Sequence, residues 1–177
     1  MKIEIFKLPI WIGNIDCEKI DLESNDMKRT WYSETLSSLN TDNKISQKSM
    51  NYILNIIYNL TKKEYGYYQY GLLNIWSNSY AENDYQEPHI HAGSHLSFII
   101  YKKVNEAKTV FNHPCQNIIE AFQMSNFFDT IFEPKCRENQ IVVFPSFMEH
   151  WVKKNSDSFT IAGNVKLIEK EKNDIRS

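Results

Sequence analysis

The alternation of apolar and polar residues predicts the elements of the N-terminal part of the chain. The opening stretch KIEIFKLPIWIGNI alternates and then turns apolar, which predicts a strand. The segment ISQKSMNYILNIIYNLTKKEYG has apolar residues at helical spacing, Lys62 and Lys63 in its last turn and Gly66 to end it. We therefore expect a long amphipathic helix that packs on a sheet. Residues 16–43 are mostly polar, and within them we expect a short helix over 24–39.

After Gly66 the pattern is that of short strands. The expected strand segments are YYQYGLLNIWSNSY, HLSFIIYKKV, KTVFNH, NQIVVFPS, EHWVKK and SFTIAGNVKLIE. The turn KNSDS between the last two predicts a hairpin, and residues 114–134 form an insertion of mixed pattern. About six to eight short strands after one or two helices favour a mostly β fold, a sandwich or jelly roll with helical cover.

Length and composition favour a single domain over residues 1–177. With 177 residues, 42% of them hydrophobic, the chain can bury one sizeable core but not two. We place the β core at about 68–167, the N-terminal strand and helices at 1–66, and a short solvated tail at 170–177.

Charge, apolar runs and cysteine usage exclude several classes of protein. The net charge of −2 argues against a nucleic-acid partner. Apolar runs such as 96–101 and 141–147 are too short to cross a membrane, and no basic, apolar leader is present. The three cysteines lack CxxC spacing, which indicates reduced thiols and a cytoplasmic protein.

The stretch PHIHAGSH carries the candidate chemistry. On a strand, His89 and His91 would point to the same face, and His150, at the start of a later strand, is the candidate for a third ligand. Three imidazoles on one face of an octahedron leave positions open for substrate or oxygen, and they suit Fe, Zn, Ni and Cu alike. The alternative is that these are ordinary hydrogen-bonded histidines. His95 is expected to be a neighbour of the site and His113 a loop residue.

These residues also stand in a longer ordered pattern. A Trp-x-Asn strand precedes the H-x-H pair, then come a small-residue turn, a Tyr-bearing strand, a Phe-Pro-Ser segment with a histidine, and a strand ending in Asn. The positions are Trp76, Asn78, His89, His91, Ser94, Ser97, Tyr101, Phe144, Pro145, Ser146, His150 and Asn164. The pattern covers roughly residues 68–167 and resembles the 2-oxoglutarate/Fe(II) oxygenase family of marine bacteria and T4-like phages.

The resemblance implies a double-stranded β-helix, a cupin-like jelly roll that encloses an Fe(II) site. It implies a dioxygenase that uses 2-oxoglutarate and O2 to hydroxylate its substrate, in the host cytoplasm if the chain is phage-encoded. It also implies that His89, His91 and His150 hold the iron, with His91 at a position where related prolyl hydroxylases have a carboxylate.

The co-substrate anchor departs from the family pattern. The family's arginine and serine positions correspond here to Ser158 and Thr160, so no arginine stands there. Strand lysines could replace it, although such lysines are commonly solvated strand ends. The residues we expect to bind co-substrate are Tyr101, Lys102 or its neighbour Lys103, Lys166, Ser158, Thr160, Asn78 and Asn164. Trp76, Trp151, Phe98 and Phe147 are candidates for cavity walls or simply for the core.

Two other functions stay open at this stage. One is a cupin-like three-histidine metalloprotein, a dioxygenase or isomerase that does not use 2-oxoglutarate. The other is a jelly-roll module without catalysis. The substrate, whether a small molecule or a peptide, has no signature in residues 16–43 or 114–134.

Overall fold

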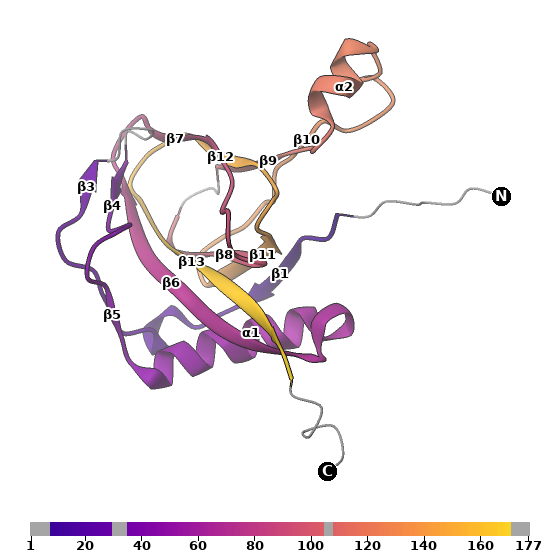
Figure 1. Cartoon of the computed structure of the whole chain (residues 1–177). Coiled ribbons are helices and arrows are strands. Elements are labelled where there is room, and N and C mark those ends of the chain that lie inside the picture. The colour runs from indigo at the N-terminus through magenta and orange to yellow at the C-terminus, as the bar shows by residue number, and fades with distance from the viewer. Residues whose placement is uncertain (1–7, 30–34, 105–107, 171–177) are drawn as a thin grey trace.

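The computed structural model describes residues 8–29, 35–104 and 108–170. Figure 1 shows a body of β-strands with helix α1 lying along one side, while helix α2 stands away from that body. The helices are α1 (Gln47–Tyr65) and α2 (Gln116–Ala121), with a 3-10 turn at Cys17–Lys19. None of the helices in the described ranges is long and apolar enough to cross a membrane.

The strands of the described residues form two large sheets and a small one. Their bounds are β1 (Trp11–Asn14), β2 (Leu22–Glu23), β3 (Lys28–Arg29), β4 (Leu36–Ser37), β5 (Lys44–Ile45), β6 (Tyr68–Tyr80), β7 (Asp84–His89), β8 (Leu96–Lys103), β9 (Thr109–Asn112), β10 (Ile131–Phe132), β11 (Gln140–Pro145), β12 (His150–Asn155) and β13 (Ser158–Glu169). One sheet has the order β1-β11-β8-β13-β6-β4-β3, the second β10-β9-β12-β7, and β2 pairs with β5.

The order of strands confirms the expected fold class. From β6 to β13 the chain passes back and forth between the two large sheets, with β6, β8, β11 and β13 in one and β7, β9, β10 and β12 in the other. All the pairings are antiparallel. Two facing sheets wound in this way form a double-stranded β-helix, or jelly roll.

Helix α1 forms where its periodicity predicts, and its sequence explains both ends. The Ser46 hydroxyl accepts the backbone N–H of Ser49 as an N-cap, and Gly66 follows the last turn. The buried side chains recur every four residues at Ser49, Ile53, Ile57 and Thr61. This stripe packs on the outer face of the seven-stranded sheet, against side chains such as Ile75, Ile100 and Ile161.

The space between the two large sheets contains a buried cluster and a cavity. The cluster includes Tyr101, Phe111, Phe144 and Met148, and two of these, Tyr101 and Phe144, also line the cavity. On each strand of the larger sheet the residues alternate, so that β8 sends Leu96, Phe98 and Ile100 toward α1 and Ile99 and Tyr101 toward the facing sheet. This alternation decides which residues can reach an internal site.

Three expectations about local structure need correction or lie outside the described residues. The hairpin at KNSDS is wrong, because β12 and β13 pair in different sheets and Asp157, with φ 43°, turns the chain from one to the other. The helix expected over 24–39 is wrong in the described part, which holds β3 and β4 instead. Of the N-terminal strand, β1 is confirmed, and residues 1–7 lie outside the described residues.

Candidate metal centre

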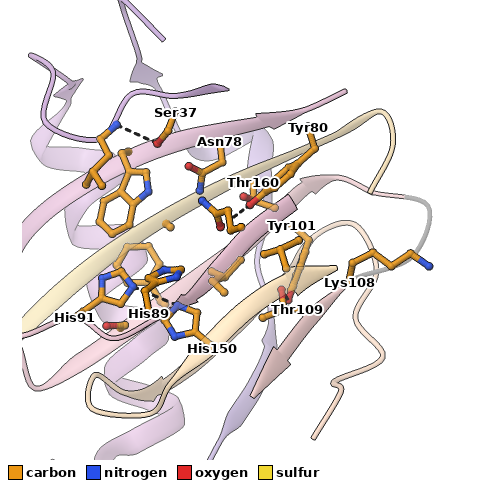
Figure 2. A pocket seen from close by; sticks show the side chains of 18 of the residues that line it. Ser37, Asn78, Tyr80, His89, His91, Tyr101, Lys108, Thr109, His150 and Thr160 are labelled. Carbon is orange, nitrogen blue, oxygen red and sulfur yellow. Dashed lines mark hydrogen bonds between the residues drawn. The ribbon is translucent and has the colours of Figure 1, made fainter. Parts of the chain in front are cut away.

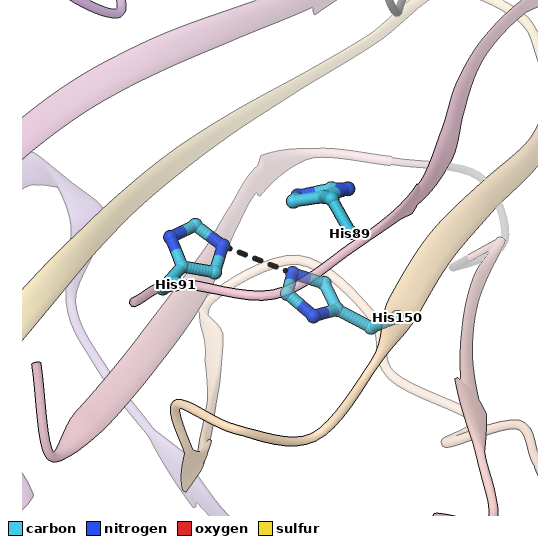
Figure 3. Close-up of side chains that lie close together, drawn as sticks. All are labelled: His89, His91 and His150. Carbon is cyan, nitrogen blue, oxygen red and sulfur yellow. Dashed lines mark hydrogen bonds between the residues drawn. The ribbon is translucent and has the colours of Figure 1, made fainter. Parts of the chain in front are cut away.

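Three histidines from separate points of the chain meet between the sheets. His89 ends β7, His150 begins β12, and the two are paired across these strands. His91 lies two residues beyond β7, where its backbone N–H donates to the carbonyl of Ser146 at 3.0 Å. Figure 3 shows the three imidazoles turned toward one another, and one ring nitrogen from each lies within 4.8 Å of the others.

The reason expected for this convergence is wrong for His91. We expected strand alternation to place His89 and His91 on one face, but β7 ends at His89 and the following residues form a turn. His91 is held in place instead by the hydrogen bond from its backbone N–H to the carbonyl of Ser146, which follows β11. His89 and His91 therefore converge because His89 pairs with His150 at the end of β7 and His91 is bonded to Ser146. Strand alternation is not the cause.

Backbone carbonyl groups set the protonation of two of the rings. The Nδ1–H of His89 donates to the Glu87 carbonyl at 2.7 Å, and the Nδ1–H of His150 donates to the Met148 carbonyl at 3.0 Å. A carbonyl can only accept, so each of these rings carries its proton on Nδ1 and keeps a lone pair on Nε2. His91 Nε2 lies 3.2 Å from His150 Nε2. The ligand nitrogens thus face the common centre.

Burial keeps the three imidazoles neutral. It lowers the pKa of His89, and it lowers the pKa of His150, which is only 3% exposed, well below the usual value. Burial and the neighbouring His89 lower the pKa of His91 to about 4. Neutral imidazole is the form that binds a metal, so the cluster is ready to coordinate near neutral pH.

Aromatic rings enclose the cluster. The indole of Trp76 stacks on His91 with centroids 5.5 Å apart, and Phe144 meets His150 edge-on at 4.7 Å. Phe111 lies on another side of His150 at 5.8 Å. These contacts restrict the rotation of the imidazole rings, and they surround the site with apolar atoms that exclude water.

A cavity of about 390 Å³ extends from the histidines between the sheets. Figure 2 shows the three histidines at one end and Tyr80, Tyr101, Thr109 and Lys108 toward the other. Among the described residues that line it, no Asp, Glu or Arg occurs, and Lys108 is the one lysine. The described lining therefore has polar and apolar side chains, and among them Lys108 is the one with a permanent charge.

A polar row crosses the cavity floor on three adjacent strands. Thr160 of β13 is paired with Asn78 of β6 on one side and with Tyr101 of β8 on the other, and all three line the cavity. We call Asn78, Thr160 and Tyr101 the polar row. A second row lies two residues farther along the strands, on the side of the histidines. It consists of the apolar residues Trp76, Ala162 and Ile99, and we call it the apolar row.

The groups around the polar row are partly paired. The Tyr101 hydroxyl donates to Thr109 Oγ1 at 3.0 Å, and the Tyr80 hydroxyl donates to Gln86 Oε1 at 2.8 Å. Burial raises the pKa of both tyrosines, so they remain protonated donors. The Asn78 Oδ1 atom is buried without a hydrogen-bond partner. An unsatisfied buried polar atom costs about 1–3 kcal/mol, which a bound molecule could recover.

Five candidates for co-substrate binding lie outside the cavity lining, one of them Lys103, whose ammonium donates to Asp157 Oδ1 at 2.6 Å. Ser158 is buried with its Oγ unpartnered, and Asn164 accepts a hydrogen bond from Ser97 at 2.7 Å. Lys102 is exposed and close enough to the Cys17 thiol to oppose the rise in that group's pKa caused by burial, which places it on the helix side of the sheet. The Lys166 ammonium donates to the Gly93 carbonyl at 3.2 Å.

The candidate wall residues and the two remaining histidines also differ in whether they reach the cavity. Trp76 and Phe98 are among the residues that line the cavity, whereas Trp151 and Phe147 are not. His95 is exposed, and its Nδ1 accepts the backbone N–H of Leu167 at 2.9 Å, so it ties β8 to β13. His113 is an exposed turn residue, as expected.

Several lining residues were not singled out by the sequence, among them the polar residues Tyr80, Gln86, Lys108 and Thr109. Tyr80 lies two positions beyond Asn78 on the same strand, and strand alternation could have identified it. Gln86 and Thr109 belong to the smaller sheet, and their place facing the polar row depends on how the two sheets pack. Lys108 directly precedes β9.

The donor set fits a divalent transition metal. Three neutral imidazole nitrogens suit Fe, Zn, Ni or Cu, and their separation leaves room for an ion between them. His91 Nε2 and His150 Nε2 form a hydrogen bond, in which His91 Nε2–H donates because His150 has its proton on Nδ1. A cation bound between the two nitrogens would take the place of that proton. Three protein ligands would leave half of an octahedral coordination sphere for other molecules.

The chain was compared with known proteins. Residues 74–161, just under half of the chain, match the model of a family described as "Putative 2OG-Fe(II) oxygenase". No curated protein gave a significant match.

Solved structures with similar folds include a 2OG-Fe(II) oxygenase family oxidoreductase from Burkholderia pseudomallei, with 10% identity over 89% of this chain and 68% of that one, and a TM-score of 0.48. A Pseudomonas putida prolyl-4-hydroxylase has 9% identity, coverage of 80% and 75%, and a TM-score of 0.49. HygX from Streptomyces hygroscopicus, with nickel and 2-oxoglutarate bound, has 10% identity, coverage of 90% and 82%, and a TM-score of 0.49. The family match begins within β6, ends within β13 and includes His89, His91 and His150.

Proposed function

We propose that the chain is a member of the 2OG-Fe(II) oxygenase family, a dioxygenase that hydroxylates a small-molecule or peptide substrate. In this proposal His89, His91 and His150 bind Fe(II). The observation that carries it is the meeting of three imidazole nitrogens within 4.8 Å at one end of a cavity. The match to the oxygenase family over residues 74–161, which contain these histidines, supports the choice of chemistry.

When bound, Fe(II) would supply the redox chemistry that couples oxidation of 2-oxoglutarate by O2 to hydroxylation of a C–H bond. The protein's own part is to position and to shield. The carbonyls of Glu87 and Met148 hold two of the imidazoles in the ligating tautomer. Trp76, Phe111 and Phe144 exclude water from the ligand nitrogens and restrict ring rotation.

The co-substrate would lie in the cavity between the histidines and the polar row. Tyr101, Thr160 and Asn78 line that space and offer hydroxyl and amide groups. Ser158 and Asn164 would act indirectly, through the packing of β13 beneath these groups. Lys102 and Lys166 are outside the lining, so we assign neither a contact with the co-substrate.

One observation favours a second candidate. The three-histidine cluster includes no carboxylate, and no arginine stands among the described residues that line the cavity. A three-histidine dioxygenase or isomerase that binds its substrate directly at the metal, with no 2-oxoglutarate, would have the same features. A module without catalysis would hold no metal at these histidines.

Charge and cysteine state indicate the setting of this activity. The net charge of −2 argues against nucleic acid as a partner. Cys17, Cys115 and Cys136 are free thiols, which fits a reducing compartment such as the cytoplasm.

Anaerobic titration tests the proposal. Protein loaded with Fe(II) should develop a weak visible absorption band when 2-oxoglutarate is added, because the co-substrate chelates the ion. Iron binding without this band would favour the second candidate. Failure to bind any divalent metal would exclude both enzyme functions and leave a module without catalysis.

A further inference from the structure

A projecting segment, which we call the arm, leaves the body of the molecule at the edge of the four-stranded sheet. The arm comprises residues 114–132, which follow β9 and contain α2 and β10, and Figure 1 shows α2 standing away from the two large sheets. Strand β10 is the edge strand of its sheet, and the backbone N–H of His113 donates to the Thr130 carbonyl at 2.7 Å across the base of the arm. The arm is thus tied to the body at its base alone among these contacts.

The arm exposes its apolar side chains. Helix α2, which the structure describes in full, keeps all six of its residues out of the core, and it is far shorter than the roughly 12–15 residues that an isolated helix needs to be even marginally stable. The exposed large apolar residues of the arm are Ile118, Phe122, Met124, Phe127, Phe128, Ile131 and Phe132. A short helix gains its stability from packing, so these side chains indicate a surface that binds a partner.

The apolar area of the arm matches that of a stable interface. Its four phenylalanines are 50–75% exposed, and a phenylalanine buries about 150–250 Å², so together they leave on the order of 500 Å² uncovered. Ile118, Met124 and Ile131 bring the patch to roughly 700 Å², above the roughly 300–600 Å² of the largest patch on a typical monomer. Two arms covered in one complex would bury about 1,400 Å², within the range of about 1,200–2,000 Å² for specific interfaces.

An apolar hollow of about 350 Å³ lies at the base of the arm. The apolar residues that line it include Leu8, Ile10, Phe111, Phe132 and Met148. Its volume lies within the range of ligand pockets, about 300–1,000 Å³, and so accommodates an aromatic side chain. The chain therefore carries an apolar projection and an apolar recess beside each other.

We propose that the arm binds a second copy of this chain, with each arm seated in the hollow of the other copy. A projection and a recess on one chain are self-complementary, as a two-fold symmetric dimer requires, and because the hollow adjoins the base of the arm both contacts can form around one axis. The arm contains no Lys or Arg, the residues that draw a surface helix to anionic lipid, so a membrane suits it less well. All the arm residues lie outside the lining of the metal cavity, so the dimer and the proposed function stand or fall separately.

Sedimentation velocity over a range of concentrations tests for the dimer. The full chain should dimerise with a Kd in the micromolar range or below. Phe122→Asp and Phe127→Asp each place a carboxylate in the apolar contact, and each should weaken dimerisation about tenfold or more. Tyr67→Asp is the matched control, because Tyr67 is 84% exposed and lies outside the arm and the hollow, and it should leave the Kd within about twofold. Circular dichroism checks that each variant is folded.

Mixing two variants tests how the arm is seated. Leu8→Asp places a charge in the hollow and leaves the arm intact, whereas Phe122→Asp alters the arm and leaves the hollow intact. A heterodimer of the two keeps one unaltered contact between an arm and a hollow, while each homodimer keeps none. The mixture, followed by fluorescence anisotropy with one variant labelled, should therefore associate more tightly than either variant alone.

Three results would overturn the proposal. The first is a wild-type chain that stays monomeric at about 100 μM, well above the Kd expected for an interface of this size, whether or not it sediments with anionic vesicles. The second is a dimer that Phe122→Asp and Phe127→Asp leave intact, or that Tyr67→Asp weakens as much as they do. The third is a mixture of Leu8→Asp and Phe122→Asp that associates no more tightly than its components, which would rule out the exchange of arms.

Discussion

At the scale of single residues, the two ring nitrogens of His89 and of His150 have separate roles. Nδ1 of His89 and Nδ1 of His150 donate to backbone carbonyls two residues earlier in the chain, which leaves Nε2 for a metal. The residue types, and the choice of His150 as the third histidine, could be predicted from the sequence. The hydrogen bonds that fix the tautomers could not, because they depend on the backbone path before each histidine.

The positions of the residues expected to bind co-substrate were less predictable than those of the histidines. Tyr101, Thr160 and Asn78 face the cavity as expected, whereas Lys102 is on the helix side of the same strand as Tyr101. Adjacent residues of a strand face opposite ways, so Tyr101 and Lys102 could not both reach one cavity. A strict use of that rule on the sequence would have removed Lys102.

Removal of His150 should abolish tight metal binding. His150→Ala deletes the most buried of the three ligands, and we expect affinity for Ni(II) to fall by more than the roughly 10–100-fold that loss of a supporting contact costs. Calorimetry measures the affinity, and circular dichroism checks that the variant is folded. His113→Ala, an exposed histidine outside the cluster, should bind metal like the unchanged chain. A folded His150→Ala protein with unaltered affinity would refute the ligand set.

At the scale of elements, long segments with a clear period were predictable and short ones were not. Helix α1 and the long strands β6, β8 and β13 appear where their patterns place them. Residues 24–39 contain the two-residue strands β3 and β4, which hold their place by pairing with each other and with β6, not by local preference. The predicted hairpin failed for a related reason, since a turn sequence does not say whether the chain returns to the same sheet.

Helix α1 should contribute strongly to stability through its buried stripe. Ile57 has 0% exposure and packs in the cluster between the helix and the seven-stranded sheet. Ile57→Ala should lower the free energy of unfolding by about 2–5 kcal/mol, through lost burial and the cavity left behind. Urea denaturation measures this. Lys48→Ala, on the exposed side of the helix, should change it by no more than about 0.5 kcal/mol. Equal effects of the two changes would mean that the helix does not pack as described.

At the scale of the whole molecule, the fold brings a strand end, a turn and a strand start to one point between two sheets. Each large sheet provides part of the site, since the histidines lie on or beside the smaller sheet and the polar row lies on the larger one. The strand count predicted a jelly roll, but the way in which the sheets face each other could not be predicted. That arrangement places the Thr109 hydroxyl against the Tyr101 hydroxyl, while the Lys108 side chain extends away from Tyr101 (Figure 2).

The metal-free protein should lose stability as the pH falls below about 6.5. The pKa of His91 is about 4 in the folded chain against 6.5 ordinarily, and those of His89 and His150 are also lowered. The unfolded chain therefore takes up protons first, and the contribution of these groups, present above the unfolded pKa, is lost as pH falls toward the folded values. Hydrogen bonds from Ser46 and Ser49 lower the pKa of Asp21 to about 2, so the stability that this carboxylate contributes is lost only at lower pH.

Thermal melts at pH 7.5 and pH 5.5 measure this effect. We expect a lower Tm at pH 5.5, and a smaller difference in a variant with all three histidines changed to Gln. The same melting temperature at both pH values in the metal-free protein would contradict buried, neutral imidazoles.

The most direct test of the central claim is the formation of succinate from carbon-13-labelled 2-oxoglutarate, followed by NMR. The account predicts that Fe(II)-loaded protein forms succinate only when O2 is present, even without its own substrate at a slow rate, and that His150→Ala forms none above the rate of free iron. Wild-type protein that binds Fe(II) at the three histidines and yet forms no more succinate than free iron would contradict the assignment as a 2-oxoglutarate-dependent oxygenase.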